Sequence, residues 1–150
     1  EWEVRGREVR GKEVRIKMEV IPRFRNKWKG GFMKILHFQE LLVWQKAHQL
    51  TLEIYKLTKN YPDEERFGLV NQIRRSFASI CANLAEGYKK STKEFLRYID
   101  IADGSLEETK YHLVLSKDLH YCDSFEFDKI YNLTCEVGKM LNGLSQKLRF

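Results

Sequence analysis

One stretch, residues 71–109, constrains the fold more than any other part of this chain. It contains no proline, and its apolar residues recur every three or four positions, which is the spacing of one face of an α-helix. The first half carries the apolar stripe Ile73, Phe77, Ile80, Leu84 and Tyr88. The second half repeats the pattern with Phe95, Ile99, Ala102 and Leu106. The stretch therefore predicts two amphipathic helices joined by a short turn.

Two signals mark the turn between these helices. Gly87 follows Glu86 where a left-handed helix cap is expected, and glycine adopts that conformation without a steric penalty. Ser91 stands three residues before Glu94, and this spacing predicts a capping box that opens the next helix. Since only about three or four residues connect the two helices, we expect them to lie antiparallel as a hairpin.

Two further helices are predicted around this hairpin. The first spans about residues 38–60 and ends at Pro62, because the residue before a proline disfavours helical geometry. The third helix continues past Gly104, a glycine that predicts close packing against another backbone. Asp123 or Ser124 would cap a last helix, whose apolar stripe is Ile130, Leu133, Val137, Met140, Leu144 and Leu148. The expected fold is all-α, an antiparallel up-down-up-down four-helix bundle over residues 36–150.

The first 32 residues differ from this pattern. Glu-Val-Arg recurs every five residues from Glu3, a period that matches neither a helix face nor a strand face. Residues 1–33 hold ten Lys and Arg against five Glu, a balance of +5, whereas residues 34–150 hold 17 against 16, a balance of +1. We interpret residues 1–32 as a disordered or non-native basic extension before a natural start at Met33. The functional alternative is a flexible basic arm that contacts nucleic acid.

The antiparallel hairpin predicts charge pairs between its helices. If the chain turns near residues 89–90, Arg74 and Arg75 lie across from Glu107 and Glu108. Arginine and carboxylate groups at that separation form charge-assisted hydrogen bonds. We therefore assign these four residues to a structural polar network.

The same reasoning places Trp44 of the first helix beside Asn83 of the second. A buried indole N–H needs an acceptor, and the side chain of Asn83 or of Glu86 could provide one. Trp44, Asn83 and Glu86 therefore complete the predicted structural network, because no nucleophile or metal-ligand set accompanies them.

No catalytic residue, metal site or cofactor is predicted. The four histidines belong to no His-Glu-x-x-His motif, and no Glu-x-x-His spacing suits a di-metal bundle site. Cys81 could act as a nucleophile with His48, but a cysteine among apolar residues more often belongs to the core. The three cysteines form no C-x-x-C pair, and no apolar run reaches membrane-spanning length. These features predict a non-enzymatic protein without membrane contact, its thiols reduced in the cytoplasm.

A basic cluster at the start of the third helix is the candidate nucleic-acid site. It comprises Lys89, Lys90, Lys93 and Arg97. Cations near a helix N-terminus, where backbone N–H groups point outward, can bind phosphates. The structural alternative is a solvated loop whose lysines maintain solubility.

Aromatic residues near the connection between the third and fourth helices suggest a second surface. They are Tyr111, Tyr121, Phe125, Phe127 and Tyr131. Tyrosine and phenylalanine are enriched at the centres of protein interfaces, so this end of the bundle could bind a protein partner. Alternatively, these rings cap the bundle itself.

Several motifs resemble a known family. They are Gln72-x-Arg74-Arg75, Ser79-Ile80-x-x-Asn83-x-Ala85-Glu86-Gly87, Lys93-Glu94-Phe95 and Ala102-x-Gly104-Ser105-Leu106-Glu107-Glu108. Over roughly residues 36–148 the chain is similar to the bacterial 23S rRNA-intervening sequence protein family, also called the four helix bundle protein family. This family is related to the accessory variability proteins of diversity-generating retroelements.

The resemblance implies a homopentamer without known catalytic activity. The retroelement relatives are associated with the binding of nucleic acid and of a reverse transcriptase. We therefore predict a non-enzymatic oligomer that binds structured RNA weakly. The alternative is a protein-interaction scaffold for a polymerase-type partner, such as a reverse transcriptase, without direct RNA contact.

Overall fold

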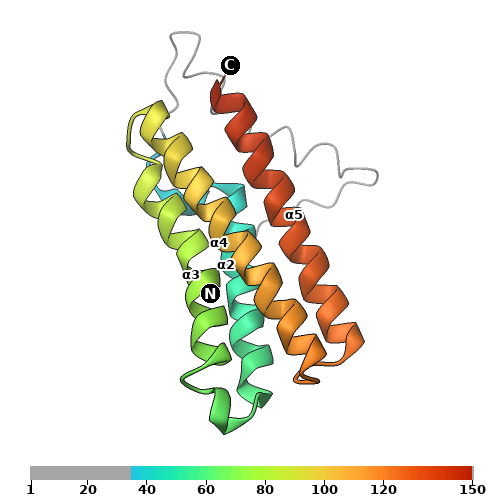
Figure 1. Ribbon diagram of the computed structural model, residues 1–150. Coiled ribbons are helices and arrows are strands. Elements are labelled where there is room, and N and C mark those ends of the chain that lie inside the picture. Colours follow the sequence, from blue (N-terminus) through green and yellow to red (C-terminus); the bar gives the residue numbers. More distant parts are fainter. Residues whose placement is uncertain (1–34, 150) are drawn as a thin grey trace. The chain divides into compact units, whose positions relative to one another are not determined.

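The computed structural model describes residues 35–149, so the predicted extension over residues 1–32 lies outside the described residues. Four helices follow one another in a compact unit: α2 (Leu42–Leu57), α3 (Leu69–Gly87), α4 (Thr92–Asp118) and α5 (Ser124–Arg149). Consecutive helices run in opposite directions (Figure 1). The described residues contain no β-strand. The predicted all-α, up-down-up-down four-helix bundle is therefore confirmed.

Short 3-10 turns replace both ends of the predicted first helix. They are η1 (Phe38–Glu40) before α2 and η2 (Thr58–Asn60) after it, and η3 (Asp63–Glu65) follows Pro62. Leu41, between η1 and α2, has extended backbone angles and is almost completely buried. The first α-helix is therefore shorter than predicted, but η1, α2 and η2 together still cover the predicted range of residues 38–60.

Most residues of the predicted apolar stripes form the core, whereas Tyr88, Leu133 and Met140 are only half-buried. Each of the four helices contributes at least one fully buried side chain: Ile54 from α2, Phe77 from α3, Leu106 from α4 and Val137 from α5. In α5 the stripe lies partly elsewhere, because Leu141 is buried where the pattern placed Met140. No helix among residues 35–149 is both long and apolar enough to cross a membrane.

The left-handed cap predicted at Gly87 is wrong, and the residue has a different role. Gly87 is the last residue of α3, and Tyr88 after it keeps right-handed helical angles. A Cβ atom at Gly87 would lie 2.7 Å from the Cβ of Tyr98 and 2.8 Å from a ring carbon of Phe95. Glycine is therefore needed here because α4 approaches the backbone of α3 closely.

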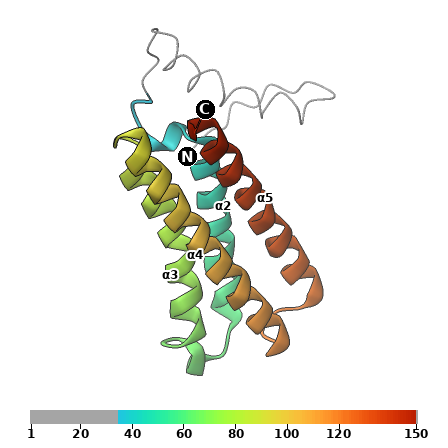
Figure 2. The same ribbon diagram turned by 45° about the horizontal axis from the view of Figure 1, so that its top comes forward.

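Helix α4 passes through Gly104 as predicted, but the close packing expected there is not found within the described chain. A Cβ atom at Gly104 would meet no atom within 4 Å among the described residues. The residue lies on the exposed side of α4. Both views show α3 and α4 side by side (Figure 2).

Candidate nucleic-acid interface

The turn between α3 and α4 is closed by a capping box at Ser91. The Ser91 hydroxyl accepts a hydrogen bond from the backbone N–H of Glu94 at 3.3 Å. The Glu94 carboxylate in return accepts bonds from the Ser91 N–H at 3.2 Å and from the Ser91 hydroxyl at 2.6 Å. This confirms the capping box, and these hydrogen bonds lower the pKa of the Glu94 carboxyl below its usual value.

The capping box changes how an anion could bind at this turn. The Glu94 carboxylate already occupies the N-terminus of α4 and takes the Ser91 donors. A carboxylate at this position is favourable because it faces the positive end of the helix dipole. A phosphate would therefore have to rely on the side-chain cations of the turn more than on the backbone donors that the sequence suggested.

All four predicted cations are exposed around this turn. Lys89 and Lys90 lie in the turn itself, and Lys93 and Arg97 lie one helical turn apart on α4. None of the four forms an ion pair with another described residue within 4.0 Å; the Lys89 ammonium instead lies 5.4 Å from the centre of the Tyr88 ring. The structure therefore brings the four predicted residues to one end of the helix pair with their charges open to solvent.

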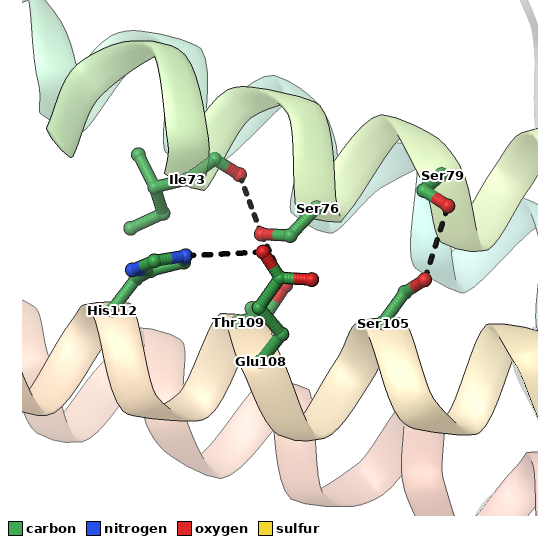
Figure 3. Close-up of polar contacts among 7 residues, drawn as sticks. All are labelled: Ile73, Ser76, Ser79, Ser105, Glu108, Thr109 and His112. Atoms are coloured by element: carbon green, nitrogen blue, oxygen red, sulfur yellow. Dashed lines mark hydrogen bonds and ion pairs between the residues drawn. The ribbon is translucent and has the colours of Figure 1, made fainter. Parts of the chain in front are cut away.

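Small hydroxyl residues set the register between α3 and α4 (Figure 3). The Thr109 hydroxyl donates to the Ser76 hydroxyl at 2.9 Å, and the Ser79 and Ser105 hydroxyls lie 3.0 Å apart. A hairpin folded symmetrically about residues 89–90 would instead place Ser79 opposite Ile101. The two helices are therefore offset by about one turn from the predicted register.

The predicted arginine pairs are wrong because of the direction in which the two side chains leave α3. Arg74 lies on the side of α3 that faces α2, where its Nε donates to the Thr58 hydroxyl at 2.8 Å and its guanidinium lies 4.7 Å from the centre of the Tyr55 ring. Arg75 is exposed and forms no ion pair with the described residues. The four residues assigned to this half of the network, Arg74, Arg75, Glu107 and Glu108, are thus not brought together.

The two glutamates find partners on their own helix. Glu107 forms an ion pair with Lys110, and Glu108 lies 3.4 Å from the Nε2 atom of His112. Both carboxylates have half or more of their side-chain surface exposed, so pairs of this kind contribute little to stability. Local pairs three or four residues apart thus replace the predicted contacts between helices.

The predicted cluster of Trp44, Asn83 and Glu86 is also not formed. The Trp44 ring stacks on His48 at 4.8 Å and meets Phe38 edge-on. Asn83 donates to the carbonyl and hydroxyl oxygens of Ser79 on its own helix, and Glu86 is exposed. Helices α2 and α3 pair with Thr51 beside Cys81 and Thr58 beside Arg74, about one turn from the assumed register.

The predicted aromatic surface divides into packed and exposed rings. Tyr121 packs on Tyr61 with the ring centres 5.4 Å apart, and its hydroxyl donates to Glu65. Phe127 and Tyr131 stack on each other. Tyr111 and Phe125 remain 62% and 78% exposed.

Sequence reasoning missed Phe67, the most exposed aromatic ring among residues 35–149, which is 86% exposed in the connection before α3. Phe67 lies outside the apolar stripes of the predicted helices. That position in the sequence could have indicated that its ring is not part of the core. Packed and exposed rings therefore coexist at this end of the bundle.

The possible nucleophile Cys81 lies in an unfavourable setting. Burial raises the pKa of its thiol, and its sulfur lies 3.7 Å from the Thr51 hydroxyl, while His48 stacks on Trp44. A thiol reacts as the thiolate, so this environment suppresses its reactivity. Across the described part of the chain, no three His, Cys, Asp or Glu side chains are grouped so that they could hold a metal ion.

Comparisons with known proteins agree with this architecture. A family model described as the 23S rRNA-intervening sequence protein matches residues 39–143. The chain is also similar to a solved structure from Bacteroides thetaiotaomicron, described as a protein of unknown function from the S23 ribosomal protein family. The two share 29% identity with a TM-score of 0.65, over 70% of this chain and 96% of that one. No curated protein matches.

Proposed function

Because this chain belongs to the 23S rRNA-intervening sequence protein family, we propose that it is a non-enzymatic assembly protein that binds structured RNA weakly and without strong sequence preference. The exposed cluster of Lys89, Lys90, Lys93 and Arg97 supplies the phosphate contacts. The family description names ribosomal RNA as its context, and a cationic surface is what a phosphate backbone requires.

The observation that carries this proposal is that four exposed cations without carboxylate partners among the described residues gather at one turn. Elsewhere, Lys46, Lys56, Lys110 and Lys129 pair with glutamates, while Lys59, Arg75 and Lys139 are exposed without an ion pair but lie outside this turn. Glu94, the acid within the cluster, is already bonded to Ser91. Positive charge that is not neutralised within the chain is available to an anionic ligand.

The cluster predicts a measurable salt dependence. Each phosphate neutralised adds about 0.7 to the slope of log K against log salt for single strands and about 0.9 for a duplex. Four contacts would therefore give a slope of about −3 to −4 for one copy. A closed ring, a pentamer as the family resemblance implies, would repeat the cluster and strengthen weak contacts through avidity.

The test is a titration of a labelled ribosomal RNA fragment with the full chain at two salt concentrations. The double variant Lys89→Gln and Lys93→Gln is expected to weaken binding and to reduce the slope by about 1.4–1.8 per copy. Its free energy of unfolding should change by less than about 0.5 kcal/mol, because both side chains are exposed.

The matched control removes two exposed lysines elsewhere, with Lys59→Gln and Lys139→Gln. The control has the same net charge as the double variant, so any effect of overall charge or of the basic N-terminal residues appears equally in both. If the control weakens binding as much as the cluster variant does, the cluster is not the RNA site.

A second candidate function is a protein-interaction scaffold for a polymerase-type partner, without direct RNA contact. It is favoured by the almost full exposure of Phe67 and Phe125, since large exposed aromatic side chains are typical anchors of protein interfaces. Complete absence of RNA binding at low salt, together with binding of a reverse transcriptase that Phe67→Ser and Phe125→Ser abolish, would favour this function.

A further inference from the structure

A group of four aromatic rings adjoins the basic cluster of the α3–α4 turn. It consists of Phe38 in η1, Trp44 and His48 in α2, and Tyr88 directly after α3. The Phe38 ring centre lies 4.9 Å from that of Trp44 and 6.1 Å from that of Tyr88, and Trp44 in turn stacks on His48. The η1 segment, drawn in cyan, lies beside the α3–α4 turn (Figure 2). We call these four residues the ring cluster.

The ring cluster is not enclosed in the core of the bundle. The apolar stripe of α3 placed Tyr88 in the core, but all four rings of the cluster are only half-buried. Aromatic surface that gathers in one place marks a binding surface more often than rings that are scattered singly. The end of the bundle that carries the exposed cations therefore also presents exposed aromatic surface.

Tyr88 is the ring that directly joins the two groups. The Lys89 ammonium lies over its face, 5.4 Å from the ring centre. The Tyr88 hydroxyl donates to the Leu36 carbonyl oxygen at 3.2 Å, and this bond uses the edge of the ring and leaves its faces uncovered. Attraction between an ammonium and an aromatic face is weak at an exposed site. A flat ligand can therefore replace Lys89 on this face, while the displaced ammonium stays close to it.

The charge around Tyr88 indicates what kind of flat ligand fits. Residues 86–97 hold four Lys and Arg against two acids, Glu86 and Glu94, a balance of +2. The Glu94 carboxylate is already bonded to Ser91. A ligand that matches this surface has a flat ring with a negative group beside it. A nucleotide combines the two, because its base stacks on aromatic side chains and its phosphate attracts cations.

We propose that Tyr88 stacks on an unpaired base of the RNA, while Lys89 leaves the ring and contacts the adjacent phosphate. This inference rests on the function proposed above and adds which nucleotides the site takes. Bases within a duplex are already stacked and paired, whereas bases in loops and bulges can turn outwards onto an aromatic ring. Every base has a flat face, so such a site accepts different sequences but prefers unpaired nucleotides.

Stacking and phosphate contact respond differently to salt. A phosphate contact releases counterions and adds to the slope of log K against log salt, whereas a stacked base releases none. Tyr88→Leu should therefore weaken RNA binding by the same factor at every salt concentration and leave the slope unchanged. Loss of one base–aromatic stack corresponds to a loss of affinity of about 5-fold or more.

The decisive test removes the ring and the base in turn. The full chain is titrated with a labelled RNA hairpin and with the same hairpin whose loop lacks its bases but keeps its sugars and phosphates. The unmodified chain should bind the intact hairpin about 5-fold more tightly or better. Tyr88→Leu should lose this preference, because two changes that remove the same contact are not additive.

Two matched variants control for other effects of the substitution. Tyr88→Phe keeps the ring and removes only the hydroxyl that bonds Leu36, so it should bind both hairpins as the unmodified chain does. Tyr111→Leu removes a ring that is 62% exposed and lies about 21 Å along α4 from Arg97, and it should leave both affinities unchanged. Circular dichroism shows whether Tyr88→Leu folds, and the comparison of the two hairpins on the unmodified chain needs no variant.

The possible failures are distinct. Equal binding of the two hairpins by the unmodified chain would overturn the stacking and leave the proposed phosphate contacts intact. The same conclusion would follow if Tyr88→Leu weakened binding to both hairpins equally, or if Tyr88→Phe weakened it as much as Tyr88→Leu does. Absence of binding to any RNA at low salt would overturn the proposed function and this site together.

Discussion

The two ends of the bundle hold their helices together in different ways. At the α3–α4 turn, Ser91 and Glu94 close the connection through bonds between residues three positions apart. At the opposite end, Tyr121 reaches across 56 residues of sequence to Glu65 and packs on Tyr61. One end is therefore stabilised by local contacts, and the other by contacts between two separate connections.

This difference indicates at which end of the bundle a functional site can form without lowering the stability of the fold. Local capping leaves the cations of the α3–α4 turn free of structural duties, so a ligand can use them. At the opposite end, most of the surface of Tyr61 and part of that of Tyr121 are committed to joining the connections. Substitutions there should cost much more stability than substitutions at the basic turn.

The largest effect is expected for Tyr61→Ala. Tyr61 is only 6% exposed and packs against Tyr121, so truncation removes a large buried ring and leaves a cavity. The free energy of unfolding should fall by about 3–5 kcal/mol, measured by urea denaturation. Tyr111→Ala, on a ring that is 62% exposed, is the control and should change it by less than about 0.5 kcal/mol. A loss below about 1 kcal/mol for Tyr61→Ala would show that this end is not held by the ring.

A smaller effect is expected from alkaline pH. Burial raises the pKa of Tyr61 to about 12 from a usual value of 10.0, so the folded state binds the phenolic proton more tightly than the unfolded state does. The stabilisation that the protonated Tyr61 hydroxyl provides is complete below pH 10. As the pH rises towards 12, the free energy of unfolding should fall by about 2–3 kcal/mol.

Thermal melts between pH 9 and pH 11.5 test this expectation. Tyr61→Phe lacks the titrating group, so its melting temperature should fall less steeply over the same range. Equal slopes for the two proteins would contradict the link to Tyr61. Cys122, whose thiol pKa is also raised by burial, interacts with the Tyr61 hydroxyl, so the two proteins are compared with Cys122→Ala in both.

The smallest of these effects belongs to the basic turn. Ser91→Ala removes the N-cap of α4 and should lower the free energy of unfolding by about 1 kcal/mol. Ser124→Ala is the matched control, because Asp123 and not Ser124 exchanges hydrogen bonds with Glu126 at the start of α5. If Ser91→Ala proved as harmful as Tyr61→Ala, the contrast between the two ends would fail.

Features that depend on neighbouring residues were predictable from the sequence. The helix stripes around Phe77 and Leu106 and the capping box at Ser91 follow from spacings within one or two turns, and of the two predicted caps for α5, Asp123 and Ser124, the structure shows Asp123. The exposed basic cluster was predictable for the same reason, since lysines beside a short turn have no buried position to occupy.

Only the tertiary structure decided how far each helix slides along its neighbour. Turn length suggested a register, but the contacts of Ser76 with Thr109 and of Ser79 with Ser105 determine a different one, by about one turn. The tertiary structure also decided that Arg74 faces α2, where it bonds Thr58, and does not reach Glu107 or Glu108. Arg75 lies on the surface. A few small side chains can set the register because packed helices must fit along their whole length, whereas a turn constrains only the residues that it joins.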